Sequence, residues 1–256
     1  MWTEWGWMWP AIIASALISI ALVPLGNRVL ERGMVFADLA IAQWAALGIL
    51  LVGTVFPDGG SALSLSGSLA MALLAVAMVS LALRYLTRHR EAMIGLLYAL
   101  GACLATLLVS QDPHGAQRLA HTLNGDLLWT TPAVLGPMVL LAIAVLVWQY
   151  SLPQCYTGWL FLPLFAVAIT LTVDLAGIYV VFTSLIAAPL LLIHLRGTSI
   201  VAAILACLAG HSLGLLISAW QDLPTGPTVV IATMATMATC AGVAVLARKP
   251  INRDAW

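Results

Sequence analysis

Three residues place ionisable side chains inside otherwise apolar runs of this sequence. They are Asp38, Asp174 and His211. An ionised carboxylate at the centre of a membrane-spanning helix costs roughly 2.5–3.5 kcal/mol, so an acid in an apolar run usually faces a partner or a water-filled cavity. A neutral imidazole can act as a metal ligand. The chemistry that these side chains suggest is the passage of a cation along a membrane-embedded path.

Each of these residues also has a purely structural interpretation. Asp38 lies close to one end of its apolar run, where Asp is a good N-cap. His211 could bond a neighbouring carbonyl group, and Asp174 lies near the end of its run, where an acid at the interface needs no ligand. The sequence leaves both interpretations open for all three.

The motifs of hydrolytic and nucleotide-binding enzymes are absent from the sequence. It has no H-E-x-x-H, no G-x-S-x-G and no G-x-x-x-x-G-K-[ST]. The four cysteines lie singly, with no C-x-x-C pair, so neither a disulfide framework nor a thiolate zinc site is suggested. We predict that the chain is not an enzyme, that it has no cofactor, and that any ATP it depends on is bound by another subunit.

The composition indicates that membrane-spanning helices position these residues. The chain has 256 residues, of which 62% are apolar and 8% charged, against roughly 25% charged in ordinary soluble domains. Its mean hydropathy is +1.06. Ten basic and ten acidic residues cancel, so there is no basic surface for nucleic acid. We predict an all-α polytopic membrane protein in the lipid bilayer, with no nucleic-acid partner.

The apolar runs predict about nine transmembrane helices in one domain, residues 1–256. Each run is close to the ~20 residues that cross a bilayer at 1.5 Å per residue. Only Asp174 and Gly177 interrupt the sixth and seventh runs, so eight crossings with one broken helix is the alternative. The predicted spans lie near residues 9–26, 38–56, 65–84, 92–110, 128–150, 159–176, 178–195, 199–219 and 228–247.

The basic residues predict the orientation. If nine spans alternate, nine of the ten Lys and Arg residues lie on one side and only Arg118 lies on the other. Basic loops mark the cytoplasmic face, which places the N-terminus outside and the C-terminus inside. The outer face then collects five acids together with His114 and His121. We interpret them as a solvated rim, with a cation-attracting vestibule as the alternative.

Four segments, in order, resemble the membrane permeases of zinc and manganese ABC importers. The segment from Glu31 to Gly48 is similar to their second helix, and that from Glu91 to Tyr98 to their fourth. The segment from His114 to Leu128 resembles their following outer segment. The stretch from Gly214 to Pro227, with its Pro-Thr-Gly-Pro sequence, resembles the one before their last helix. The resemblance runs from about Arg28 to Val245, and it identifies the chain as a divergent member of this family.

The resemblance implies the function and the partners. Such a permease lies in a bacterial inner membrane, pairs with a second copy or a paralogue, and receives its substrate from an extracytoplasmic binding protein. A separate ABC ATPase drives it. The alternatives are a permease for a metal chelate and a non-transporting scaffold subunit. The sequence does not choose among zinc, manganese, iron and a chelate.

The resemblance also assigns site residues. In that family the position of Asp38 belongs to the cation path, which makes Asp38 a transient metal ligand, and a His usually follows four residues later. This chain has Ala42 there. Gln43 is one residue further and lies about 140° away from Asp38 at 100° per residue, unless a π-bulge realigns it. We assign Asp38, Gln43, Asp174 and His211 to the transport path.

The segment that docks the ATPase in the resembling family is short in this chain. Only residues 151–158 separate the fifth and sixth predicted spans, too few for a helix of more than one turn. We therefore expect the ATPase to dock on other inner residues, chiefly Arg84, Arg88, Arg90 and Glu91, with Arg28–Arg32 beside them.

Glycine, alanine and proline predict two local features. Pro224 and Pro227 fix the backbone around Gly226, which can take a positive φ, so we expect a tight turn there and re-entry at Val229. The small-residue runs at 37–46 and 202–214 predict close helix packing.

Overall fold

The chain is all helical where the computed structural model describes it, as predicted. The described residues are 6–32, 36–56, 60–85, 90–110, 112–151, 154–194 and 199–247, and they contain no β-strand. The elements in chain order are η1 (Gly6–Met8), α1 (Trp9–Glu31), α2 (Ala37–Val55), α3 (Ser61–Tyr85), α4 (Arg90–Val109), α5 (Gly115–Asn124), η2 (Leu127–Trp129), α6 (Pro132–Tyr150), α7 (Gln154–His194), α8 (Ile200–Gln221) and α9 (Thr225–Ala247).

Eight of the described helices are long and apolar enough to cross a membrane, which confirms the prediction of a multi-pass membrane protein. They are α1 to α4 and α6 to α9, and they lie close to the predicted runs. The hydropathy pattern did not predict α5. This helix has ten residues, and it packs Leu119 and Leu123 against the core while its other side is polar.

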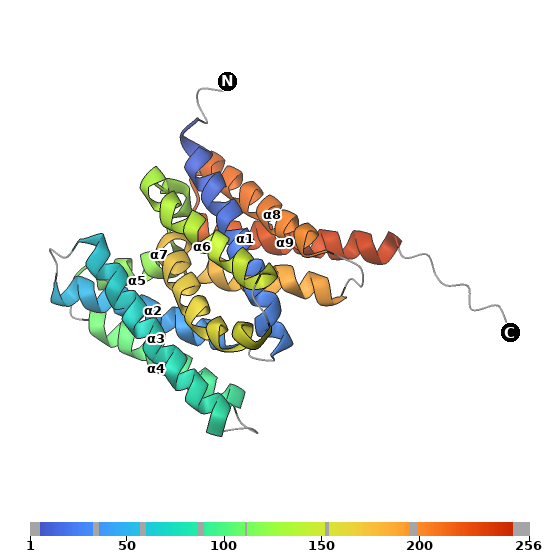
Figure 1. The fold of residues 1–256 in the computed structure, drawn as a ribbon. Coiled ribbons are helices and arrows are strands. Elements are labelled where there is room, and N and C mark those ends of the chain that lie inside the picture. Colours follow the sequence, from blue (N-terminus) through green and yellow to red (C-terminus); the bar gives the residue numbers. More distant parts are fainter. Residues whose placement is uncertain are drawn as a thin grey trace.

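Helix α7 consists of two helices that join at a kink in its middle. Its 41 residues would extend about 60 Å at 1.5 Å per residue, twice the ~30 Å of the hydrocarbon core. Gly177 interrupts it with φ 78° and ψ 164°, which are not helical values. The two predicted spans at 159–176 and 178–195 are therefore the two halves of one broken helix. Figure 1 shows that the halves leave the bend in different directions.

The break in α7 lies at a junction of three glycines. A Cβ atom on Gly177 would collide with the backbone nitrogen of Gly125, and one on Gly226 would collide with the carbonyl group of Asn124. The backbones of α5, α7 and α9 thus touch with no side chain between them. The N–H of Asp126 also donates to the carbonyl oxygen of Leu175, at 3.2 Å, across this contact.

The turn between α8 and α9 differs in detail from the prediction. Gly226 lies in the first turn of α9 and has no positive φ. The left-handed residue is Asp222, with φ 54°. Gly226 is required for the close approach to α5, since any side chain there would overlap Asn124. The chain does turn between Gln221 and Thr225, and the sequence pattern shows this turn but not what packs against Gly226.

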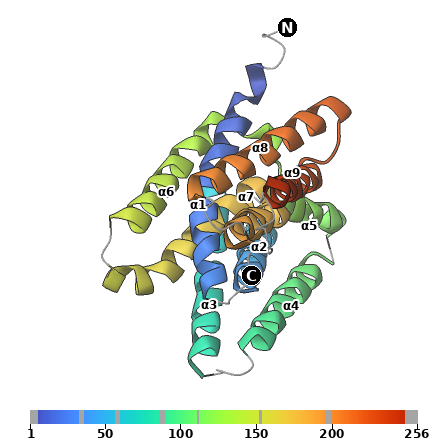
Figure 2. The ribbon, with the colours of Figure 1, turned by 90° about the vertical axis from the view of Figure 1, so that its right-hand side faces the viewer.

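The helices form a buried centre and a less buried periphery. Helices α1, α2 and α7 are mostly buried, whereas fewer than a third of the residues in the most apolar stretches of α3, α4, α6 and α9 are buried. Figure 2 shows α6 and α4 on opposite sides of α1 and α7. The predicted close packing of the small-residue run in α8 is confirmed, because Gly210 and Gly214 face the backbones of Thr233 and Val229 on α9.

Replacement of Gly177 by Ala should destabilise the fold. A Cβ atom in the left-handed region costs roughly 1–2 kcal/mol, and here it would also collide with Gly125. We expect a lower Tm in detergent and a smaller monodisperse fraction. The control is Gly136→Ala on α6, where a Cβ meets nothing within 4 Å and Ala favours the helix. An unchanged Tm for Gly177→Ala would show that the break does not depend on glycine.

Candidate functional site

Asp38 lies in the first turn of α2, and only 1% of it is exposed. Its Oδ1 atom accepts a hydrogen bond from the N–H of Leu39, at 2.8 Å. Such first-turn amides have no acceptor within the helix. Phe36, not Asp38, occupies the N-cap position, so the capping alternative holds only in part. The other oxygen, Oδ2, is buried and has no hydrogen-bond partner among the described residues. One carboxylate oxygen serves the helix, and the other is available to a ligand.

Gln43 points away from Asp38. Helix α2 is an uninterrupted α-helix from Ala37 to Val55, with no π-bulge to realign it. A Cβ atom on Gly101 of α4 would lie 3.2 Å from the Cγ atom of Gln43. The neighbouring Trp44 donates its Nε1–H to the carbonyl oxygen of Leu97, also on α4, at 2.9 Å. The structure therefore places Gln43 at the packing contact between α2 and α4, apart from Asp38.

His211 lies fully buried between α8 and α7. Its Nε2 atom is 3.0 Å from the Oγ atom of Ser184 and 3.7 Å from the Sγ atom of Cys207. The Ser184 hydroxyl donates its single proton to the carbonyl oxygen of Val180, at 2.7 Å, so it accepts from Nε2–H. The backbone of Ser15 on α1 also lies close to the buried ring. These contacts favour the structural interpretation of His211, as a tie between two helices.

Sequence spacing could not reveal the partner of His211, because Ser184 lies 27 residues away. Nothing in the sequence distinguishes the hydroxyl group of Ser184 from those of the other Ser and Thr residues of α7. Most of them bond a carbonyl one turn earlier on their own helix, as Thr172 and Thr183 do.

Asp174 lies at the end of the molecule where α5 packs. Its side chain is exposed, and it is close enough to His121 of α5 for electrostatic attraction. His121 also lies 4.0 Å from a carboxylate oxygen of Asp126. Arg118 reaches the carbonyl oxygen of Gly53 near the end of α2, at 3.5 Å. Asp38 is about 20 Å from that level, at 1.5 Å per residue, so Asp174 and Asp38 do not form one site.

Two clefts open at this end, on either side of α5. One has a volume of about 430 Å³ and is lined by His121, Asp126 and Asp222, among others. The other measures about 460 Å³ and is lined by His114, Arg118 and His121. Both contain residues that the sequence placed on one rim. The acidic wall of the first cleft could admit a hydrated cation, whereas the lining of the second contains Arg118 and no acid.

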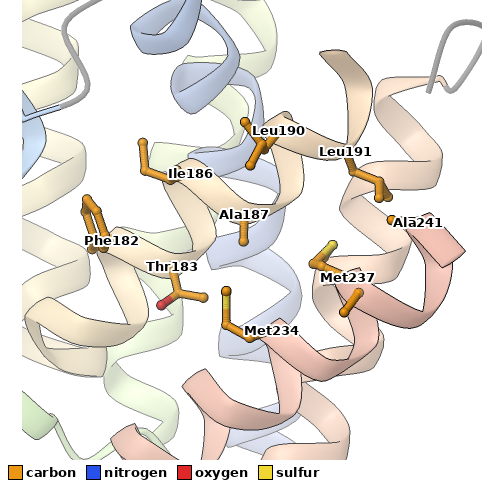
Figure 3. A pocket seen from close by; sticks show the side chains of 10 residues that line it. Phe182, Thr183, Ile186, Ala187, Leu190, Leu191, Met234, Met237 and Ala241 are labelled. Atoms are coloured by element: carbon orange, nitrogen blue, oxygen red, sulfur yellow. The ribbon is translucent and has the colours of Figure 1, made fainter. Parts of the chain in front are cut away.

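A third hollow is apolar. Figure 3 shows this groove, of about 400 Å³, between the second half of α7 and α9. Leu190, Met234 and Met237 line it, and Thr183 contributes the hydroxyl group in view. Its lining suits an acyl chain or an apolar side chain and offers no carboxylate or imidazole to a cation.

The predicted ATPase-docking residues are only partly described. Arg84 lies in the last turn of α3 and Glu91 in the first turn of α4, and both are exposed. Arg90 begins α4, but its side chain is outside the described part of the structure, and Arg88 is wholly outside it. Helix α7 begins at Gln154, so the described residues contain no separate helix between α6 and α7.

The described residues contain no group of three or more His, Cys, Asp or Glu side chains that could hold a metal ion. A cation at Asp38 would therefore meet at most two such side chains of the described residues, with water or other oxygen atoms as its remaining ligands. Such a site is too weak to retain an ion, and it is suited to letting an ion pass.

Comparison with models of known families places the chain in one family. The family model of the ABC 3 transport family matches residues 4–156, more than half of the chain. No protein of curated function matches it in sequence. PsaBC from Streptococcus pneumoniae in complex with Fab has a similar structure, with a TM-score of 0.74 at 16% identity over 93% of this chain and 95% of that chain.

A second solved structure is described as an inward-facing conformation of a metal-chelate type ABC transporter. It has a TM-score of 0.63 at 18% identity, over 93% of this chain and 85% of that chain. At these identities the two structures show that the fold is shared.

The contacts of His211 predict that Ser184→Ala lowers stability but not transport. An interhelical hydrogen bond in a membrane contributes about 0.6 kcal/mol on average and up to about 1.7, so we expect a small fall in Tm and near-normal uptake of substrate. Ser66→Ala is the control, since that hydroxyl bonds only the carbonyl of Leu63 on its own helix. Reduced uptake at an unchanged Tm would instead place His211 on the transport path.

Proposed function

Because the chain belongs to the ABC 3 transport family, a family of membrane permeases, we propose that it forms the path of an importer for a metal ion. A divalent cation such as zinc or manganese is the substrate that its residues fit best. ATP is hydrolysed by a separate ATPase chain, and an extracytoplasmic binding protein delivers the substrate. The permease domain occupies the whole chain, and a second permease copy or paralogue completes the path.

The observation that carries this proposal is the free oxygen of Asp38. A buried carboxylate oxygen without a partner is costly in an apolar surrounding, and a cation supplies the missing charge and contact. The alanines nearby, among them Ala40, Ala42 and Ala45, are small and buried. A transport path needs only a few ligands, because an ion held by four good ligands would not leave.

A metal chelate is the alternative substrate, and it has its own support. Four residues after Asp38 the chain has Ala42, and Gln43 points toward α4. No imidazole therefore lies on this face of α2 within one turn of Asp38. A chelated metal already has its ligands and needs no imidazole from the protein. The similar structure described as a metal-chelate type transporter supports this alternative as well.

The inner ends of α3 and α4 are the proposed docking surface for the ATPase. Arg84 and Glu91 are exposed there, and Arg88 and Arg90 lie between them in sequence. The short connection between α6 and α7 transfers this role to the α3–α4 hairpin. A scaffold subunit would bind the ATPase in the same way but would not stimulate its hydrolysis when substrate is present.

The proposed path predicts that Asp38→Asn abolishes cation uptake without loss of assembly. Asn keeps the size and the oxygen that accepts from Leu39 but removes the charge that attracts a divalent ion. We expect the uptake of zinc, manganese and iron by membrane vesicles containing the assembled complex to fall at least about tenfold, which corresponds to ~1.4 kcal/mol.

The control for this experiment is Asp112→Asn, which removes a carboxylate that pairs with Arg118 at 3.2 Å and is not part of the lining of either cleft. Normal ion uptake by Asp38→Asn, at normal expression and assembly, would exclude the path through Asp38. Loss of free-ion uptake only, with uptake of a metal chelate preserved, would show that both substrates cross and that Asp38 serves the free ion.

The basic residues predict that the α5 end of the molecule faces outward and that the ends of α1, α3 and α6 face the cytoplasm of a bacterial inner membrane. In a variant without the four native cysteines, Ser61→Cys and Gln221→Cys should react with an impermeant thiol reagent in intact cells, whereas Ser151→Cys should react only after permeabilisation. All three positions are exposed. Labelling of Ser151→Cys from outside would reverse the orientation.

A further inference from the structure

Two arginines at the end of α1 lie against buried aromatic rings. The guanidinium carbon of Arg28 is 5.9 Å from the ring centroid of Trp148 on α6. That of Arg32 is 4.2 Å from the ring centroid of Phe161 on α7. The two rings are themselves packed 5.8 Å apart and are almost completely buried. The aromatic faces therefore fix the position of both positive charges at one corner of the bundle.

Among the described residues, an acidic side chain neutralises only one of these two positive charges. Glu31 is the acid beside them. It pairs with Arg28 at 3.3 Å and accepts a hydrogen bond from Asn27 at 2.7 Å. The Nε atom of Arg28 is buried without an acceptor. The side chain of Arg32 has no ion pair or hydrogen bond within the described part of the chain. The cluster thus carries one net positive charge and several unused N–H donors.

Burial and the neighbouring positive charge of Arg28 both lower the pKa of Arg32, while Glu31 opposes the shift. The two guanidinium groups are thus close enough to repel each other. A cation at a helix C-terminus is favourable by itself, which accounts for one arginine in the last turn of α1. It does not account for a second guanidinium group or for the buried Nε atom.

The position of the cluster specifies the kind of anion. The membrane-spanning parts of α1 and α6 end at Glu31 and Tyr150, so the arginines lie at the level of lipid headgroups. Helix α6 beside them exposes Leu140, Ile143 and Val147. This apolar face suits the acyl chain of a lipid. The two arginines at its end suit the phosphate group of the same lipid.

We propose that Arg28 and Arg32 bind the phosphate group of one anionic phospholipid at the corner of α1, α6 and α7. Guanidinium groups bind phosphate oxygens in pairs through fixed N–H forks. The single negative charge of a phosphodiester matches the net charge of the cluster. The lipid joins the ends of three helices that are otherwise held there by ring contacts. This site does not depend on which substrate the permease carries.

Native mass spectrometry of the full-length chain released from micelles tests this site. The probes are phosphatidylglycerol and phosphatidylcholine with identical acyl chains. The wild-type chain should retain one phosphatidylglycerol molecule in preference to phosphatidylcholine. Arg32→Gln should lower that occupancy about fivefold, the change expected for one basic residue near an anionic surface, and Arg28→Gln/Arg32→Gln should lower it further. Arg32 is exposed, so the single variant should fold.

The matched control is Arg118→Gln, which removes one arginine at the opposite end, where it pairs with Asp112 at 3.2 Å. Its occupancy should equal that of the wild type. Equal occupancy in Arg32→Gln would overturn the proposal, and so would equal retention of the two lipids. Displacement of phosphatidylglycerol by millimolar inorganic phosphate would show a general anion site and overturn the lipid assignment. Loss of ATPase binding in Arg32→Gln, with lipid occupancy unchanged, would assign the arginines to protein docking instead.

Discussion

The fold depends on the direct contact of three backbones at Gly125, Gly177 and Gly226. A helix as long as α7 fits a bilayer only if it breaks, and in lipid a broken helix must find new partners for its backbone groups. The junction meets both requirements, because Gly177 turns the chain while Leu175 accepts a hydrogen bond from Asp126. No side chain fits between the three segments. The position of α5, the start of α9 and the direction of the second half of α7 are therefore fixed together.

Buried polar atoms need hydrogen-bond partners, and this need distinguishes the role of His211 from that of Asp38. Both are buried polar side chains. The Nε2 atom of His211 on α8 bonds the hydroxyl group of Ser184 on α7, so this hydrogen bond holds two helices together. Around Asp38 the hydrogen bond is local to the first turn of α2, so it joins no helices. The unpaired oxygen of Asp38 has no structural role in the described contacts, and this is why a function, and not stability, best accounts for the acid.

Much of this arrangement could be predicted from the sequence, since every backbone group in a lipid core must bond within a helix and long apolar runs can form little else. The broken helix at Gly177 was the alternative to nine separate spans, and the interruption of the apolar run by Asp174 and Gly177 left both open. Helix α5 was missed because its apolar residues recur at helical spacing among polar ones, and hydropathy averages hide that pattern. The direction of Gln43 followed from its spacing. The partner of His211 and the role of Gly226 depend on contacts between distant segments, which no local pattern contains.

A lone carboxylate limits what this permease can select. In the proposed path, Asp38 sets the sign of the charge that is favoured, but one hard oxygen ligand distinguishes poorly among divalent ions, whose preferences depend on the number and type of ligands. The described part of the chain places no group of three or more His, Cys, Asp or Glu side chains at Asp38. In the proposed assembly, two permease copies would supply two such carboxylates across their interface, and the remaining ligands would be water or a chelator. Selection among metals then belongs to the binding protein that delivers the substrate, while the permease excludes anions and neutral solutes.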